Sequence, residues 1–246
     1  MRQGRPRVSS VFGEFLLVVL GVLVALAADS WMDRSRDADL ERQYVEELAD
    51  ALRSDTAEIR SSMEHSAQRT ALAQRVLAVL QGSERVDNPG EFIVSVYMGG
   101  QFNIPESETA VFDELLSSGR LLLLHDAQFR RRLLAYYRRL DHPANDRWRN
   151  TIWYRYRPIA AQALSLEAQR WADAVLYRGA SVSSVPEEVA ATLDATIRQL
   201  QSVPEVEGLL REVVLAGDSQ VAFWTVLMET AADLISSAAS PDLGTR

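Results

Sequence analysis

The apolar stretch VFGEFLLVVLGVLVALAADSW, residues 11–31, constrains this chain more than any other feature. From Ser9 to Ala28 it offers 20 residues with a single charge, Glu14. A helix of that length crosses the ~30 Å hydrocarbon core of a bilayer and bonds its own backbone polar groups. Phe12 and Trp31 stand near its two ends, where aromatic side chains favour the membrane interfaces. We therefore expect a transmembrane helix at residues 11–31.

The same region has features of a cleaved secretory signal, which is the alternative interpretation. Only 14 uncharged residues separate Glu14 from Asp29, and they make about 21 Å of helix. Ala25-Leu26-Ala27 also offers a small-x-small cleavage site. A glutamate is unusual inside the apolar part of a signal, so an uncleaved anchor is favoured. Three arginines in the first seven residues predict that the N-terminus lies inside and the main domain in the periplasm of a bacterial inner membrane.

One face of the predicted anchor carries small residues together with its only charge. Glu14, Val18, Gly21, Ala25 and Ala28 recur at spacings of four and three residues, so they share a helix face. Small residues let a second helix approach closely in lipid, and an intramembrane carboxylate commonly meets a partner. This anchor stripe predicts packing against other membrane-protein subunits, and it would also allow a homo-oligomer. The alternative is that lipid tolerates the small residues and Glu14 lies at the interface.

Composition limits the chemistry of the remaining chain. The 34 acidic and 26 basic residues give a net charge of −8, which argues against nucleic acid as a partner. Cysteine is absent, so disulfides, cysteine-ligated zinc and thiol catalysis are excluded. The three histidines, at positions 65, 125 and 142, lack metal-ligand spacing, and none lies near the anchor to ligate haem or chlorophyll. We expect no metal, no cofactor and no enzymatic activity.

The chain is expected to be all-α, with the N-terminal transmembrane helix continuing into, or followed by, an extramembrane helical bundle. No glycine or proline occurs between Val22 and Gln81, so the anchor helix can run on without a break. The predicted parts are a short basic cytoplasmic tail (1–10), the anchor (11–31), a long stalk or bundle helix (32–82) and a helical domain (83–246). Within the stalk, the core-facing positions are Leu48, Leu52, Ile59 and Met63, which repeat as two pairs eleven residues apart. Pro105 is expected to open a later helix that Gly119 closes, and Asp126 to cap the next.

A segment rich in arginine and aromatic residues, 129–157, stands out in this acidic chain. It contains nine arginines and only two aspartates. Such a mixture suits an acidic partner surface or anionic lipid headgroups, and the alternative is that the arginines pair with residues 29–58 while the aromatics fill the core. The residues predicted for this partner or lipid patch are Arg131, Arg138, Arg139, Trp148, Arg149, Trp153, Tyr154, Arg155 and Arg157.

Two blocks, residues 13–31 and 107–141, resemble a family of uncharacterised bacterial single-pass membrane proteins. That family has a Gly-Glu-led anchor ending near a Trp, then a Thr-Ala-aromatic-x-Glu-Leu element, Ser-Ser-Gly and Tyr-Tyr. The matching positions here are Gly13, Glu14, Trp31, Thr109, Ala110, Glu114, Leu115, Ser117, Ser118, Gly119, Tyr136 and Tyr137. The chain departs from the family at Val111-Phe112, where the aromatic comes one place late, and at Asp29-Ser30, where asparagines are common. The resemblance implies an anchor and a helical domain, and no particular chemistry.

These features together favour a non-catalytic accessory or scaffold subunit of a larger membrane complex, with respiratory or photosynthetic assemblies as candidate hosts. The reason for this hypothesis is that a predicted anchor with a stripe of small residues is joined to a helical domain that lacks a catalytic motif. The alternative is a membrane-anchored sensor or regulator whose helical domain binds a small ligand.

Overall fold

The computed structural model describes residues 8–101, 103–140 and 144–239, with the side chains of 15–101, 103–140 and 147–239. All regular structure in these ranges is helical, as the sequence predicts. The elements are α1 (Val8–Leu80), α2 (Pro89–Gly99), α3 (Ala110–Ser117), η1 (Arg120–Leu123), α4 (Ala127–Leu140), α5 (Ala144–Arg149), the π-helical η2 (Asn150–Tyr156), α6 (Arg157–Ala163), α7 (Leu166–Tyr177), α8 (Glu187–Ala190), α9 (Leu193–Gln201) and α10 (Val206–Ala238).

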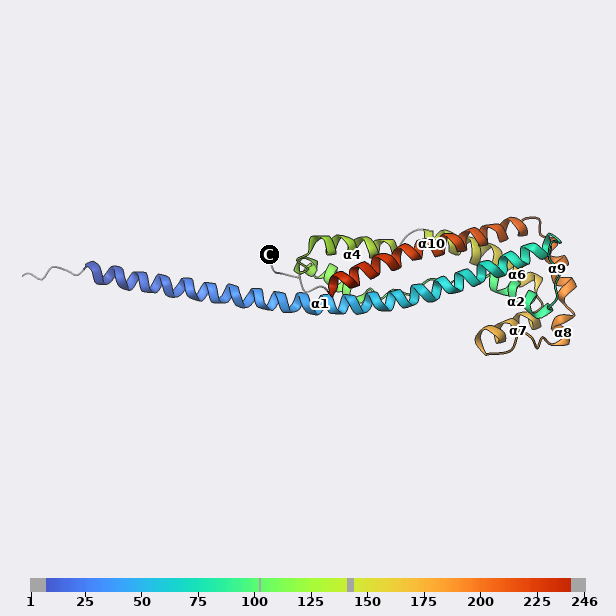
Figure 1. Ribbon diagram of the computed structural model, residues 1–246, viewed down its shortest axis with the longest axis horizontal. Helices are drawn as coiled ribbons and strands as arrows, with labels where there is room; N and C mark the ends of the chain where they lie inside the picture. The colour runs from blue at the N-terminus through green and yellow to red at the C-terminus, as the bar shows by residue number, and fades with distance from the viewer. Residues whose placement is uncertain (1–7, 102, 141–143, 240–246) are drawn as a thin grey trace, which may run out of the picture.

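Helix α1 dominates the shape of the molecule (Figure 1). It has 73 residues and is therefore about 110 Å long. Its first part projects from the bundle, with residues 15–40 exposed throughout, and from Glu41 onward one face is buried. The helix stops where Gly82 adopts a φ of 71°, a left-handed conformation that ends a helix at little cost for glycine. The anchor helix thus continues unbroken into the bundle.

Helices α1 and α10 run antiparallel along the whole bundle and form its central seam (Figure 1). Buried residues on both helices recur at alternating steps of three and four, the heptad spacing of a left-handed coiled coil. On α1 they are Glu41, Val45, Leu48, Leu52, Asp55, Ile59, Ser62, Ser66, Arg69, Ala73, Val76 and Leu80; on α10 they are Val206, Leu210, Val213, Gly217, Gln220, Trp224, Leu227, Ala231 and Leu234. Leu48, Leu52 and Ile59, which were expected to face the core, lie on this seam, and Met63 packs partly buried against the same core. The spacing of the seam is that of heptads and not the expected eleven-residue repeat.

The shorter helices add a third layer that divides into two hydrophobic cores along the seam. The proximal core, nearer the anchor, joins α1 and α10 to α3 and α4, with Leu48, Leu133 and Leu227 at its centre. The distal core joins the same two helices to α2, η2, α6 and α9, around Val76, Ile152 and Leu210. Between the two cores the seam positions are polar or small.

Polar contacts fasten the segment before α4 onto the first buried turns of α1. The buried Glu41 accepts from the His125 backbone N–H at 2.6 Å and contacts its Nδ1 at 2.7 Å. Asp55 accepts from the Glu108 N–H at 2.7 Å and from the Tyr136 hydroxyl at 3.1 Å. The Tyr44 hydroxyl donates to Glu114 Oε1 at 2.8 Å. Much of the block that resembles the single-pass family thus gathers around the proximal core.

The helix expected to open at Pro105 begins at Ala110 instead. The five intervening residues are not helical, because the Glu108 amide is bonded to the Asp55 side chain rather than to a helical turn. The predicted end of this helix is close to the observed one, because α3 ends at Ser117 and Gly119 follows it with a φ of 72°. Asp126 Oδ1 accepts from the N–H groups of Gln128 and Phe129, so it caps α4 as predicted.

Candidate functional site

The segment predicted to be the anchor is helical, and no described part of the chain covers it. Its apolar segment is long and apolar enough, by length and composition, to cross a membrane. Of the predicted anchor stripe, Val18, Gly21, Ala25 and Ala28 are exposed, and a Cβ built on Gly21 would meet no atom within 4 Å. Trp31 is also exposed. The side chains of Glu14 and Phe12 lie outside the described ones, so their roles remain predictions.

The predicted patch in residues 129–157 is wrong in one member, Trp148. This side chain is buried in the distal core, where its ring makes edge-to-face contacts with Phe223 and Trp224 at centroid distances of 5.6 and 6.2 Å. Phe129, Tyr136, Tyr137 and Tyr156 of the same segment are buried as well. A helix face that packs on the seam needs large apolar side chains, and here they alternate with surface arginines.

The remaining patch residues divide between two places. Arg131, Arg138 and Arg139 are exposed on α4. Trp153, Tyr154, Arg155 and Arg157 lie on η2 and the start of α6, where the Arg157 guanidinium stacks 3.7 Å from the Trp153 ring centre. Arg155 pairs with Glu212 at 2.7 Å, so it bonds to α10 and not to residues 29–58. Arg149 is half-buried on α5.

A buried polar layer separates the two cores, and the sequence analysis did not identify it. Ser62, Ser66, Arg69 and Thr70 of α1 and Gln220 of α10 are all at most 7% exposed. The Ser66 hydroxyl donates to Gln220 Oε1 at 2.9 Å. Gly217 completes the layer, because a Cβ there would lie 1.9 Å from Thr70 Oγ1. The α10 backbone at Gly217 therefore lies directly against the Thr70 side chain of α1.

Arg69 is the only cation of this layer. Its Nη2 donates to Ser66 Oγ at 2.8 Å and to Gln220 Oε1, and its Nη1 donates to the Gln101 carbonyl at 3.4 Å. Nε has no hydrogen-bond partner, and no carboxylate of the described residues pairs with the guanidinium. Burial lowers the Arg69 pKa to about 10, so the group stays charged at neutral pH.

The Arg69 side chain lines a cavity of about 680 Å³ on the distal side of the layer. This Arg69 cavity lies between α1, α2, α7 and the segments that follow α2 and α7. Its polar lining residues are His65, Gln68, Arg69, Arg75, Glu91, Gln101 and Asn103; the others are Leu72, Val94, Met98, Val175, Leu176, Tyr177 and Val182. The volume is in the range of small-molecule sites. The part of the chain that the structure describes contains no group of three His, Asp or Glu side chains suited to a metal.

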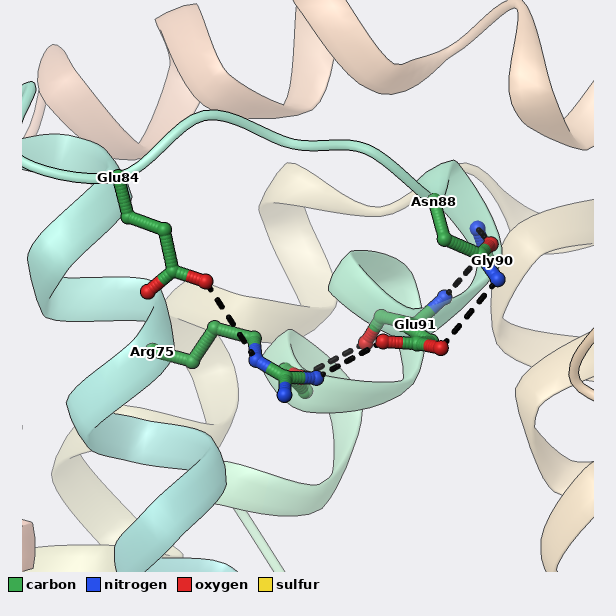
Figure 2. A network of polar contacts seen from close by, with 6 residues as sticks. Arg75, Glu84, Asn88, Gly90 and Glu91 are labelled. Atoms are coloured by element: carbon green, nitrogen blue, oxygen red, sulfur yellow. Dashed lines mark hydrogen bonds and ion pairs between the residues drawn. The ribbon is translucent and has the colours of Figure 1, made fainter.

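A second arginine of this cavity, Arg75, is neutralised by its surroundings (Figure 2). Its Nη1 lies 3.0 Å from Glu91 Oε2, and its Nε lies 3.8 Å from Glu84 Oε1. Glu91 is held in turn on the first turn of α2, where Asn88 caps the helix by accepting from the Gly90 and Glu91 N–H groups. The two arginines of one cavity thus differ: Arg75 has two carboxylates and Arg69 has neutral acceptors.

Comparison with known proteins identifies no relative. No protein-family model, no curated protein and no solved structure matches the chain. The resemblance of residues 13–31 and 107–141 to the single-pass family stays a prediction.

Proposed function

We propose that the protein is a non-catalytic, single-pass accessory subunit that packs its anchor and its helical domain against other proteins of a larger membrane complex. The proposed setting is a bacterial inner membrane, with the N-terminus inside and the bundle in the periplasm. Respiratory and photosynthetic assemblies are candidate hosts. The observation that carries the proposal is the continuity of α1, which joins an exposed apolar segment to the seam of the bundle without a break.

Two leucines at the anchor end of the bundle support a protein partner. Leu122 is 77% exposed and Leu116 is 53% exposed. Both lie close to the level of Glu41 and Tyr44, as the contacts of His125 and Arg120 with these residues show. Exposed leucines at this end of the bundle fit either lipid or protein, and their height above the bilayer decides between them.

The height favours protein. Glu41 follows Ala28, the last residue before the charged stalk, by 13 positions, which is about 20 Å of helix. The headgroup region on one side of a bilayer is only about 5–8 Å thick. With α1 near the membrane normal, Leu116 and Leu122 would stand above the lipid and face the extramembrane part of a neighbouring subunit.

The test is quantitative recovery of partner proteins with the full-length chain, extracted from its native membrane in a mild detergent. We expect the double variant Leu116→Ser/Leu122→Ser to lose most of the partner that the wild type retains. Leu215→Ser is the matched control, because Leu215 is 64% exposed and lies on α10 beside the distal core. Equal recovery with both variants, or isolation of the wild type as a lone monomer in several detergents, would contradict the proposal.

Orientation has its own test, for which a cysteine-free chain is convenient. A single cysteine introduced as Gln199→Cys, at an exposed position of α9, should react with a membrane-impermeant maleimide in intact spheroplasts. Labelling only after the membrane is broken would place the bundle on the inner side.

A second candidate function is a membrane-anchored sensor or regulator that binds a small ligand. The Arg69 cavity favours it, because the cavity has a suitable volume and a buried cation without a counter-ion. The two candidates are compatible, since partner binding and ligand binding use different parts of the bundle.

A further inference from the structure

The wall of the Arg69 cavity has a polar part and an aliphatic part. In the polar part the side chains of Arg69, Gln101 and Asn103 provide hydrogen-bond donors and acceptors. The aliphatic part consists of Val94 and Met98 from α2 and of Val175, Leu176 and Val182 from α7 and the segment after it. These aliphatic residues belong to one hydrophobic cluster that also includes Ala172. A molecule that fits this cavity has a polar end and an apolar body.

The charged residues of the cavity indicate whether its ligand is an anion or a cation. Glu91 already pairs with Arg75, so it does not call for a cationic ligand. Arg69 is 2% exposed and has only a hydroxyl, an amide oxygen and a backbone carbonyl as acceptors. A buried charge without a partner of opposite charge is costly by several kcal/mol, and one anion at this place would remove that cost.

A carboxylate suits the geometry of this arginine. A guanidinium presents its N–H groups in a planar fork that matches the two oxygens of a carboxylate. Nη1 of Arg69 makes only one long contact, at 3.4 Å to the Gln101 carbonyl, and so retains donor capacity. Because a single positive charge lacks a counter-ion here, a monoanion balances the site.

We infer that the Arg69 cavity binds a small aliphatic monocarboxylate, with its carboxylate on the Arg69 guanidinium and its chain against Val94, Met98 and Val175. This inference deepens the second candidate function by naming the class of ligand. It does not depend on the partner-recovery result, because the binding measurement uses the purified protein alone.

The experiment measures binding of octanoate to the full-length chain in phosphatidylcholine nanodiscs by calorimetry, with empty nanodiscs subtracted for partitioning into lipid. Octanamide has the same chain without the charge, and acetate has the charge without the chain. We expect saturable binding of octanoate, with an affinity at least about tenfold higher than that of either analogue. Octanamide loses the charge-assisted hydrogen bond, and acetate loses the apolar contact.

Three variants assign the binding to the cavity. Arg69→Met removes the charge at similar length and should weaken octanoate binding at least about tenfold, to the level of octanamide. Arg75→Met is the matched control, since Arg75 lines the same cavity but is already paired, and we expect less than about a threefold change. Val175→Trp fills the aliphatic part of the cavity, leaves Arg69 and its acceptors in place, and should abolish binding.

Absence of saturable octanoate binding, equal affinity for octanamide or acetate, or unchanged binding in Val175→Trp overturns the inference. Unchanged octanoate binding in a folded Arg69→Met protein does so as well. If Arg69→Met does not fold, as judged by circular dichroism, Val175→Trp and the two analogues decide the question.

Discussion

The proximal and distal cores use the same two seam helices but hold their third layer differently. In the proximal core α3 and the 14-residue helix α4 cover the seam. Side chains of α1 such as Glu41 and Asp55 bond directly to the backbone that leads into α4. In the distal core several short helices share the covering, and the Arg69 cavity lies between two of them and α1. One continuous seam thus supports a proximal region held by polar contacts and a distal region that contains a cavity.

Leucine-to-alanine changes in the two cores should have the largest effect on stability, and they test whether the cores unfold as one cooperative unit. Leu133 in the proximal core and Leu200 in the distal core are both fully buried. Each change to alanine should lower the free energy of unfolding by about 2–5 kcal/mol. Because the seam crosses both cores, we expect a single denaturant transition, followed by circular dichroism, that shifts in either variant. Two separate transitions would show that the cores unfold independently.

The close approach at Gly217 comes next in size. Gly217→Ala places a methyl group against Thr70, and should cost about 1–3 kcal/mol of stability through overpacking. Gly208→Ala on the same helix is the control, since no atom lies within 4 Å of its Cβ position, and it should be neutral or slightly stabilising. Adding Thr70→Ala should restore part of the loss in the Gly217 variant. An equal loss of stability in both variants would contradict the close contact between Gly217 and Thr70.

A smaller effect concerns the fastening of the proximal core by Asp55. Burial raises the pKa of this carboxyl above its usual value of 3.8, against the lowering effect of its bonds to Glu108 and Tyr136. The folded state therefore binds the proton more tightly than the unfolded state, and its stability falls as the pH rises from 3.8 through the raised pKa. Asp55→Asn should flatten this part of the unfolding profile measured against pH. An unchanged profile would show that other groups cause it.

The smallest effect is expected on the surface of the distal half. Arg155 and Glu212 form an ion pair in which both side chains are about half exposed, and such pairs contribute about 0–1 kcal/mol. A double-mutant cycle with Arg155→Gln and Glu212→Gln should give a coupling energy in that range, reduced by added salt. A coupling above about 2 kcal/mol would mean that this pair helps to fasten the distal core.

The parts of the fold that the sequence predicts are those with a strong local signal. The apolar stretch before Asp29 and the run without glycine or proline indicate one long helix, and α1 has that form. Asp126 caps α4 as expected because capping depends on a few neighbouring residues. Trp148 is the exception, because its arginine neighbours in the sequence indicate a surface position although its side chain is buried.

The heptad register of the seam and the presence of the cavity do not follow from the sequence, for two physical reasons. Five of the α1 seam positions, Glu41, Asp55, Ser62, Ser66 and Arg69, are polar, so a pattern of apolar repeats does not include them. A search for heptads that tolerates polar members would have found the spacing, because both seam helices keep it. The cavity walls come from segments around residues 65–75, 91–103 and 175–182, and no local pattern indicates that these segments meet.

The unbroken helix also makes the molecule a lever. From Ala28 to Leu80 it extends 52 residues with no break, an arm of about 80 Å beyond the apolar segment. Spanning helices tilt over a range of about 0–40°, and they adjust to bilayer thickness. A change of about 10° in the tilt of the anchor would carry the far tip of the bundle sideways by about 14 Å. Events in the bilayer plane would thus be converted into displacement at the end where the Arg69 cavity lies.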